Sequence, residues 1–140
     1  MLQPIRLTDA LSVAPQIEPD DVAAAAARGF RSVINNRPDG EQDGQPAGAT
    51  IEAAAQRAGL AYRHIPVVSG QLQDAQVQAF ASALEALPGP VLAFCRSGTR
   101  CASLWALQAG GDADAVLATA RAAGYDLSAL RPRMGAAGGE

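Results

Sequence analysis

One short segment of the chain places a possible nucleophile next to a cation. Its residues are Cys95-Arg96-Ser97-Gly98-Thr99-Arg100, and it follows four apolar residues, 91–94. The apolar run predicts a buried strand, and the pattern after Arg100 predicts a helix. If the loop between them curls around the Cys95 sulfur, its backbone N–H groups point inward and form a cradle for an anion.

The residue types in this loop predict thiolate chemistry. The positive end of the following helix favours negative charge, which lowers the pKa of a thiol from about 8.5 into a range of about 3.5–7.5. Arg100 can hold two oxygens of an oxyanion with its planar fork. A thiolate beside an oxyanion cradle is a nucleophile with a substrate site. The alternative is that Cys95 is a structural cysteine buried in a strand-to-helix turn.

The elements around the loop predict an α/β fold. Strand and helix patterns alternate three times, and their connections are too long for hairpins. We therefore expect a central, mainly parallel sheet of four to five strands flanked by helices, with 91–94 near its centre. The expected strands are 5–7, 11–14, 30–35, 61–68 (with pairing ending at Pro66) and 91–94, and the expected helices are 19–28, 49–58, 74–87, 101–109 and 112–123. One domain should span residues 1–134, followed by a frayed tail over 135–140.

Composition narrows the possible functions. Hydrophobic residues make up 49% of the chain and charged residues 18%, which predicts a folded domain. The net charge of −3 argues against nonspecific binding to nucleic acid or to an anionic membrane. The chain lacks a signal-peptide pattern and any apolar run near the roughly 18 residues of a membrane span, so we expect a cytoplasmic location. A single histidine and two cysteines exclude a four-cysteine zinc site, and we expect no metal or cofactor.

A family resemblance becomes visible at the Cys-x4-Arg loop. The loop looks like the active loop of cysteine-dependent phosphatases, which usually have Cys-x5-Arg. It also looks like that of rhodanese sulfurtransferases, which can have the shorter length. Over roughly residues 5–133 the chain resembles the phosphatase-like domain of bacterial beta-lactamase hydrolase-like proteins, a dual-specificity-like cysteine phosphatase fold. The further segments that carry this resemblance are 11–16, 33–40, 64–67 and 88–92.

The resemblance implies a hydrolase that acts on a phosphomonoester through a phosphocysteine intermediate. It implies Cys95 as the nucleophile, oxyanion binding by the 96–100 loop, and transition-state stabilisation by Arg100. Domains of this type also occur fused to persulfide-oxidising metalloenzymes, which suggests a functional link to such enzymes. Two alternatives stay open: a rhodanese-like sulfurtransferase that carries a persulfide on Cys95, and a non-catalytic module. In each case the partner is a small oxyanion or a phosphorylated substrate.

Three positions depart from the usual phosphatase pattern. The loop is one residue shorter, which makes the cradle tighter and suits a terminal sulfur at least as well as a phosphoryl group. Phe94 stands where phosphatases typically have histidine. Cys101 stands where many have a serine or threonine whose hydroxyl helps the thiolate leave. We expect Cys101 to be a packing residue of the helix.

Phosphoester hydrolysis of this kind also needs a general acid, and two aspartates are candidates. Asp39, in the turn Arg37-Pro38-Asp39-Gly40, could face the same crevice as Cys95, although Pro-Asp-Gly is also a strong turn signal. Asp74 reads equally well as a first-turn helix charge. Arg37 could pair with a neighbouring carboxylate or help to draw in an anion.

The substrate itself is expected to contact mainly the loop. We expect a shallow pocket with low walls at Gly40 and Gly70, and Arg96 on its rim. The candidate substrate-binding residues are Arg37, Arg96, Ser97, Gly98 and Thr99.

Overall fold

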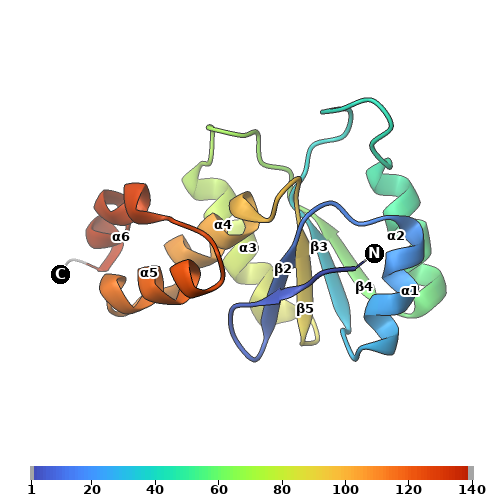
Figure 1. Cartoon of the computed structure of the whole chain (residues 1–140), viewed down its shortest axis with the longest axis horizontal. Helices are drawn as coiled ribbons and strands as arrows, with labels where there is room; N and C mark the ends of the chain where they lie inside the picture. Colours follow the sequence, from blue (N-terminus) through green and yellow to red (C-terminus); the bar gives the residue numbers. More distant parts are fainter. Residues whose placement is uncertain (1, 139–140) are drawn as a thin grey trace.

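A five-stranded sheet organises the chain, whose computed structural model describes residues 2–138, with side chains described through residue 134 (Figure 1). The strand order is β1-β2-β5-β3-β4, in which β1 is antiparallel to β2 and every other neighbouring pair is parallel. This confirms the predicted fold class and the central position of the most apolar strand. The strands are β1 (Ile5–Arg6), β2 (Leu11–Ala14), β3 (Ser32–Asn35), β4 (Ala61–His64) and β5 (Val91–Phe94).

Helices cover both faces of the sheet. In Figure 1, α1 and α2 lie together on one side, and α3 and α4 lie on the other, with α5 and α6 beyond them. A parallel sheet needs this double cover because both of its faces are apolar. The helices are α1 (Pro19–Ala27), α2 (Gly48–Ala58), α3 (Asp74–Ala86), α4 (Thr99–Ala109), α5 (Ala113–Ala122) and α6 (Arg131–Gly138), and a short 3₁₀ helix, η1 (Ser128–Leu130), precedes α6.

The alternation of side chains along β5 decides which face the candidate nucleophile joins. Leu92 and Phe94 pack with α1 and α2, in a core that also holds Ile51. Val91, Ala93 and the next residue, Cys95, belong to the core under α3 and α4. Because successive side chains of a strand point to opposite faces, the length of β5 sets the direction of the Cys95 thiol.

Several element bounds differ from the sequence prediction. Strand β4 ends at His64, before Pro66, and α4 begins at Thr99 rather than at residue 101. Neither η1 nor α6 was predicted from the sequence. Residues 135–138, which we expected to be part of a frayed tail, continue α6. Residues 139–140 of that expected tail lie outside the described part of the chain. Among the helices of residues 2–138, none has the length and apolar character needed to cross a bilayer.

Because β5 is the central strand, we expect substitutions in it to lower the free energy of unfolding. Leu92 is fully buried, so Leu92→Ala should lower the free energy of unfolding by about 2–5 kcal/mol through lost apolar burial and the cavity left behind. Gln78→Ala, on the exposed side of α3, should change it by less than about 0.5 kcal/mol. Urea unfolding of both variants measures the difference. Equal midpoints would mean that β5 is not the centre of the core.

Candidate active site

The loop after β5 curls back on the sulfur of its first residue. Cys95 directly follows β5, and Gly98 takes a left-handed conformation with φ of +94°, one residue before α4 begins. This turn aims the Gly98 N–H group at Cys95 Sγ, 3.1 Å away. A side chain on Gly98 would collide with the Tyr125 hydroxyl, which donates a hydrogen bond to the Ser97 carbonyl. The position therefore requires glycine for both its φ and its space.

Hydrogen-bond donors around Cys95 stabilise its thiolate. They lower its pKa from the ordinary value of a thiol to about 5. The largest cause is a hydrogen bond from the Cys101 thiol, and the backbone N–H groups of Cys101, Arg100 and Gly98 add to it, while burial acts in the opposite direction. At neutral pH the sulfur is therefore ionised, which is the reactive form of a cysteine.

Cys101 is a hydrogen-bond donor to Cys95 as well as the packing residue that the sequence predicted. It is fully buried in the core, as expected of a packing residue. In addition, its thiol contacts Cys95, and burial together with the neighbouring Cys95 thiolate raises the pKa of Cys101 well above its usual value. It consequently stays protonated and remains able to donate its S–H.

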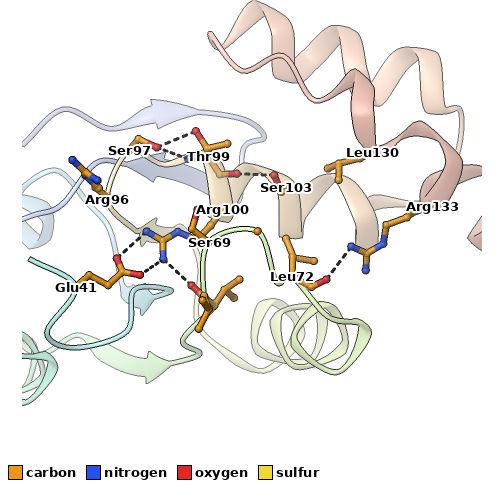
Figure 2. A pocket seen from close by; sticks show the side chains of 13 residues that line it. Glu41, Ser69, Leu72, Arg96, Ser97, Thr99, Arg100, Ser103, Leu130 and Arg133 are labelled. Atoms are coloured by element: carbon orange, nitrogen blue, oxygen red, sulfur yellow. Dashed lines mark hydrogen bonds and ion pairs between the residues drawn. The ribbon is translucent and has the colours of Figure 1, made fainter.

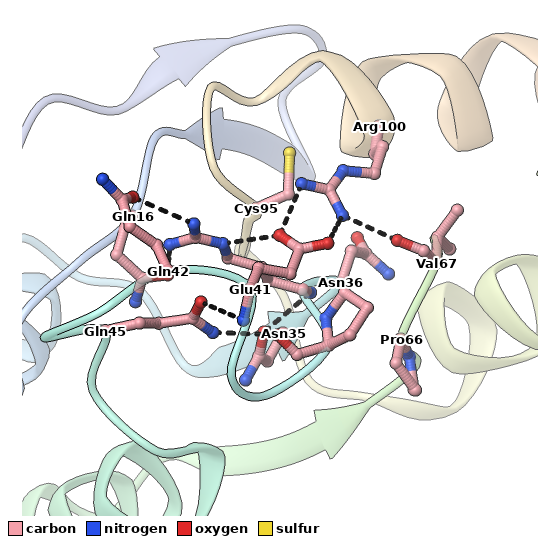
Figure 3. A network of polar contacts seen from close by, with 12 residues as sticks. Gln16, Asn35, Asn36, Glu41, Gln42, Gln45, Pro66, Val67, Cys95 and Arg100 are labelled. Carbon is pink, nitrogen blue, oxygen red and sulfur yellow. Dashed lines mark hydrogen bonds and ion pairs between the residues drawn. The ribbon is translucent and has the colours of Figure 1, made fainter. Parts of the chain in front are cut away.

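The guanidinium group of Arg100, at the end of the same loop, is paired with a carboxylate (Figure 3). Its two terminal nitrogens lie 2.7 and 3.0 Å from the two carboxylate oxygens of Glu41, and Nη1 also donates to the Val67 carbonyl at 2.7 Å. Hydrogen bonds from Arg100 and Arg37 lower the pKa of Glu41 to about 2, so it is ionised. The carboxylate of Glu41 thus takes up the N–H groups that could bind an oxyanion.

Arg37 holds Glu41 from the other side and is itself 2% exposed. Its Nε lies 2.8 Å from Glu41 Oε1, and its Nη1 and Nη2 donate to the side-chain oxygens of Gln16 and Gln42. Its backbone carbonyl lies 2.9 Å from His64 Nε2. Of the two roles expected for Arg37, pairing with a carboxylate is the one that the structure shows.

An open cavity of about 800 Å³ lies beside the loop (Figure 2). It extends beyond the loop to η1 and α6, an extent that the sequence did not predict. Gly70 lines it, as expected, whereas Gly40 is not among the lining residues. The candidates Arg96, Ser97 and Thr99 line it with Arg100, whereas Gly98 and Cys95 are buried and are not among the lining residues. The other lining residues are Glu41, Val67, Val68, Ser69, Leu72, Ser103, Leu130 and Arg133.

The two aspartates expected as acids have other contacts. Asp39 Oδ1 accepts a hydrogen bond of 2.8 Å from the N–H of Gly48, the first residue of α2. Asp74 pairs with Arg133 at 2.9 Å. Among the described residues that line the cavity, Glu41 alone carries a carboxyl group. Residues 2–138 contain no cluster of three or more histidine, cysteine, aspartate or glutamate side chains that could hold a metal ion.

Sequence reasoning missed Glu41. The one indication in the sequence was that Glu41 lies two residues after Asp39, in the same polar loop after β3. Its contact with Arg100 spans 59 residues of sequence, and the spacing within the loop gives no indication of it.

Known proteins with similar sequences and folds exist. Residues 5–112 match the family model described as "Beta-lactamase hydrolase-like protein, phosphatase-like domain". The Beta-lactamase hydrolase-like protein of Xylella fastidiosa is 41% identical over 127 residues, which cover 88% of this chain and 30% of that protein. The chain therefore spans less than a third of the length of that curated relative.

Solved structures show the same architecture. The crystal structure of a candidate phosphatase from Neisseria meningitidis superposes with a TM-score of 0.84 at 34% identity, over 95% of this chain and 96% of that one. The structure of PTPMT1 superposes with a TM-score of 0.71 at 15% identity, over 94% and 92% of the two chains. The fold is therefore that of the cysteine phosphatases.

Because the Cys101 thiol contacts Cys95, we expect substitutions of Cys101 to change the pKa of Cys95. Cys101→Ala removes the S–H donor and should raise the pKa of Cys95 by about one to two, the equivalent of a hydrogen bond to a charged group. Cys101→Ser keeps a donor and should leave the pKa near the wild-type value of about 5. The pH dependence of iodoacetamide alkylation measures both, since Cys95 is then the sole cysteine. Alkylation should begin at higher pH in the alanine variant. Identical profiles would contradict a role for the Cys101 thiol.

The position of Glu41 predicts competition with bound anions. Glu41→Gln should tighten the binding of inorganic phosphate by about three- to tenfold, because the fork of Arg100 loses an ionised competitor. Asp43→Asn changes the same charge in the same loop and should have little effect. Titration calorimetry measures both. Weaker phosphate binding in Glu41→Gln would mean that Glu41 chiefly holds Arg100 in its binding position.

Proposed function

Because the chain belongs to the family of the phosphatase-like domain of beta-lactamase hydrolase-like proteins, we propose that it is a cysteine-dependent phosphatase. It acts on a phosphomonoester through a phosphocysteine intermediate. The observation that carries this proposal is the Cys95 sulfur, whose pKa of about 5 results first from the Cys101 thiol and then from the backbone N–H groups of Cys101, Arg100 and Gly98. A thiolate and an oxyanion-binding fork on one loop are what phosphoryl transfer to sulfur requires.

In the first step the Cys95 thiolate attacks phosphorus. The S–P bond forms as the bond from phosphorus to the ester oxygen breaks, and the electron pair leaves with that oxygen. The loop N–H groups and the guanidinium of Arg100 hold the remaining phosphoryl oxygens, where charge is concentrated in the transition state. For this, Arg100 exchanges the carboxylate of Glu41 for the oxygens of the substrate.

In the second step water attacks the phosphocysteine. The S–P bond breaks, inorganic phosphate is released, and the electron pair returns to Cys95 Sγ. The donors that lower the pKa of the free thiolate also stabilise it as a leaving group. The Cys101 thiol is among these donors, and it stands in place of the hydroxyl expected from the family resemblance.

Proton delivery limits the range of ester substrates. Glu41, the carboxyl group at the cavity, is ionised at neutral pH and has no proton to give. We assign Asp39 to the N-terminus of α2 rather than to proton transfer, because its carboxylate accepts from Gly48. The ester oxygen then leaves as an anion, so aryl phosphates, whose alcohols are more acidic, are favoured over alkyl phosphates.

Sulfur transfer is the second candidate, and the four residues between Cys95 and Arg100 favour it. In that reaction the Cys95 thiolate attacks the outer sulfur of thiosulfate, an S–S bond forms, and sulfite leaves with the electron pair of the broken bond. The resulting persulfide passes its outer sulfur to an acceptor thiolate. The loop donors that stabilise the thiolate would serve this reaction equally well.

A side-by-side assay with an aryl phosphate and with thiosulfate separates the candidates. Mass spectrometry of rapidly quenched protein should show one phosphoryl group on the peptide that contains Cys95. A gain of one sulfur with thiosulfate, and no phosphoryl adduct, would replace the phosphatase by the sulfurtransferase. Neither adduct, with phosphate still bound, would indicate a non-catalytic anion-binding module.

Two substitutions test the roles of the loop residues. Cys95→Ser should abolish turnover of an aryl phosphate while phosphate binding is retained, because the cradle consists of backbone N–H groups and Arg100. Arg100→Lys should lower kcat/KM by about a hundredfold or more, since a lysine cannot supply the planar fork. Steady-state kinetics and calorimetry give both values. Wild-type activity in Cys95→Ser would show that Cys95 is not the nucleophile.

A further inference from the structure

Resting on the proposed function, we propose that the cavity selects a small phosphomonoester with an apolar middle and a second anionic group. Arg133, at the end of the cavity away from Arg100, binds that second anion. The size of the cavity, its apolar lining and the contacts of Arg133 each support a part of this substrate description.

The cavity is too large for a phosphoryl group alone. Its volume of about 800 Å³ lies within the range of about 300–1,000 Å³ in which proteins bind whole small molecules. The phosphoryl group needs only the part formed by the Cys95 loop. The remainder lies between the segment 67–72 on one side and η1 and α6 on the other, and it is available to the rest of the substrate (Figure 2).

Apolar side chains line that remainder from both sides. Val68 is 49% exposed, and it is the large hydrophobic residue that stands out as exposed in the described part of the chain. Leu72 and Leu130 are partly buried and line the same cavity from opposite elements. An apolar stretch of substrate placed here would remove this surface from water, which is favourable at about 25 cal/mol per Å².

Arg133 provides a cation where the apolar lining ends. It extends from α6, and Nη1 donates to the Leu72 carbonyl at 3.0 Å. Its Nη2 pairs with Asp74, whose side chain is 94% exposed. An ion pair this exposed contributes little, so Asp74 can be exchanged for a ligand anion at small cost. A guanidinium has five N–H donors, and these contacts leave Arg133 able to bind further oxygens.

The order of these groups defines the substrate. Figure 2 shows Arg100 and Arg133 on two sides of the cavity with Leu72 and Leu130 between them. A ligand that spans them carries its phosphoryl group at one end, an apolar body in the middle and a carboxylate or second phosphate at the other end.

Two matched esters test this substrate class. One is phenyl phosphate with a para propanoate arm, and the other has the uncharged propanamide in its place. In the wild-type protein we expect kcat/KM to be about three- to tenfold higher for the acid, the effect of one partly exposed charge pair. Arg133→Gln should bring this acid-to-amide ratio close to one. The ratio is independent of the folded fraction of a variant, so partial misfolding does not affect it.

The control variant comes from the same helix. Arg131 is exposed and pairs with Asp114, and it is not among the residues that line the cavity. Arg131→Gln changes the same charge and should keep the wild-type ratio. A third variant, Arg96→Gln, tests the rim of the loop, and it should also keep the ratio.

The outcomes distinguish failure of this inference from failure of the proposed function. A wild-type ratio near one, or loss of the ratio in Arg96→Gln with Arg133→Gln unchanged, overturns the role of Arg133 while the phosphatase stands. If neither ester is hydrolysed, the phosphatase proposal fails. Dissociation constants of the two esters from calorimetry then supply the ratio, and its loss in Arg133→Gln alone would still support the second anion site.

Discussion

The convergence of N–H and S–H donors on one sulfur is the constraint around which this structure is built. Donors from Gly98, Arg100 and Cys101 reach Cys95 only because the loop turns through a left-handed residue and enters α4 at once. That turn depends on the absence of a side chain at Gly98, against which Tyr125 packs. The direction of the thiol depends in turn on β5, whose alternating side chains are buried on both faces. The chemistry of the site is thus a consequence of the packing of the central strand.

A second set of contacts keeps the cation of the site in place. Arg37 is almost fully buried, and its charge is compensated by Glu41, which also binds Arg100. The side chain of Glu41 keeps 23% of its surface exposed, so water partly screens these pairs, and the two guanidinium groups together tie the loop that carries Glu41 to the sheet and to α4. Because the same carboxylate occupies the fork of Arg100, the proposed function requires that a substrate anion displace it. Under that proposal, binding and release are exchanges between two anions for one guanidinium.

The sequence allowed the fold and the central loop to be predicted, because both depend on local patterns. The apolar run 91–94 indicates a buried parallel strand, and the glycine after Cys95 indicates a tight turn, without knowledge of the rest. The anion cradle that the same loop predicts stays a prediction. Glu41 could not be found in this way, since its role depends on a contact with Arg100 from a distant loop. Asp39 was the more conspicuous carboxylate of that loop, yet its side chain accepts from α2. The extent of the cavity was not predicted because α6, which forms one of its walls together with η1, itself contains Pro132, Gly135 and Gly138, and these residue types obscured the helical pattern.

The state of the Cys95 sulfur tests the account most directly. A thiolate absorbs in the ultraviolet where a thiol does not, and Cys95→Ser supplies the blank for the difference spectrum. Because donors favour the charged form, the thiolate signal should be lost only as the pH falls through about 5, and it should persist at neutral pH. A signal that appears only as the pH rises toward about 8.5, the value of a free thiol, would contradict the central claim. The loop would then be a buried turn without stabilising donors.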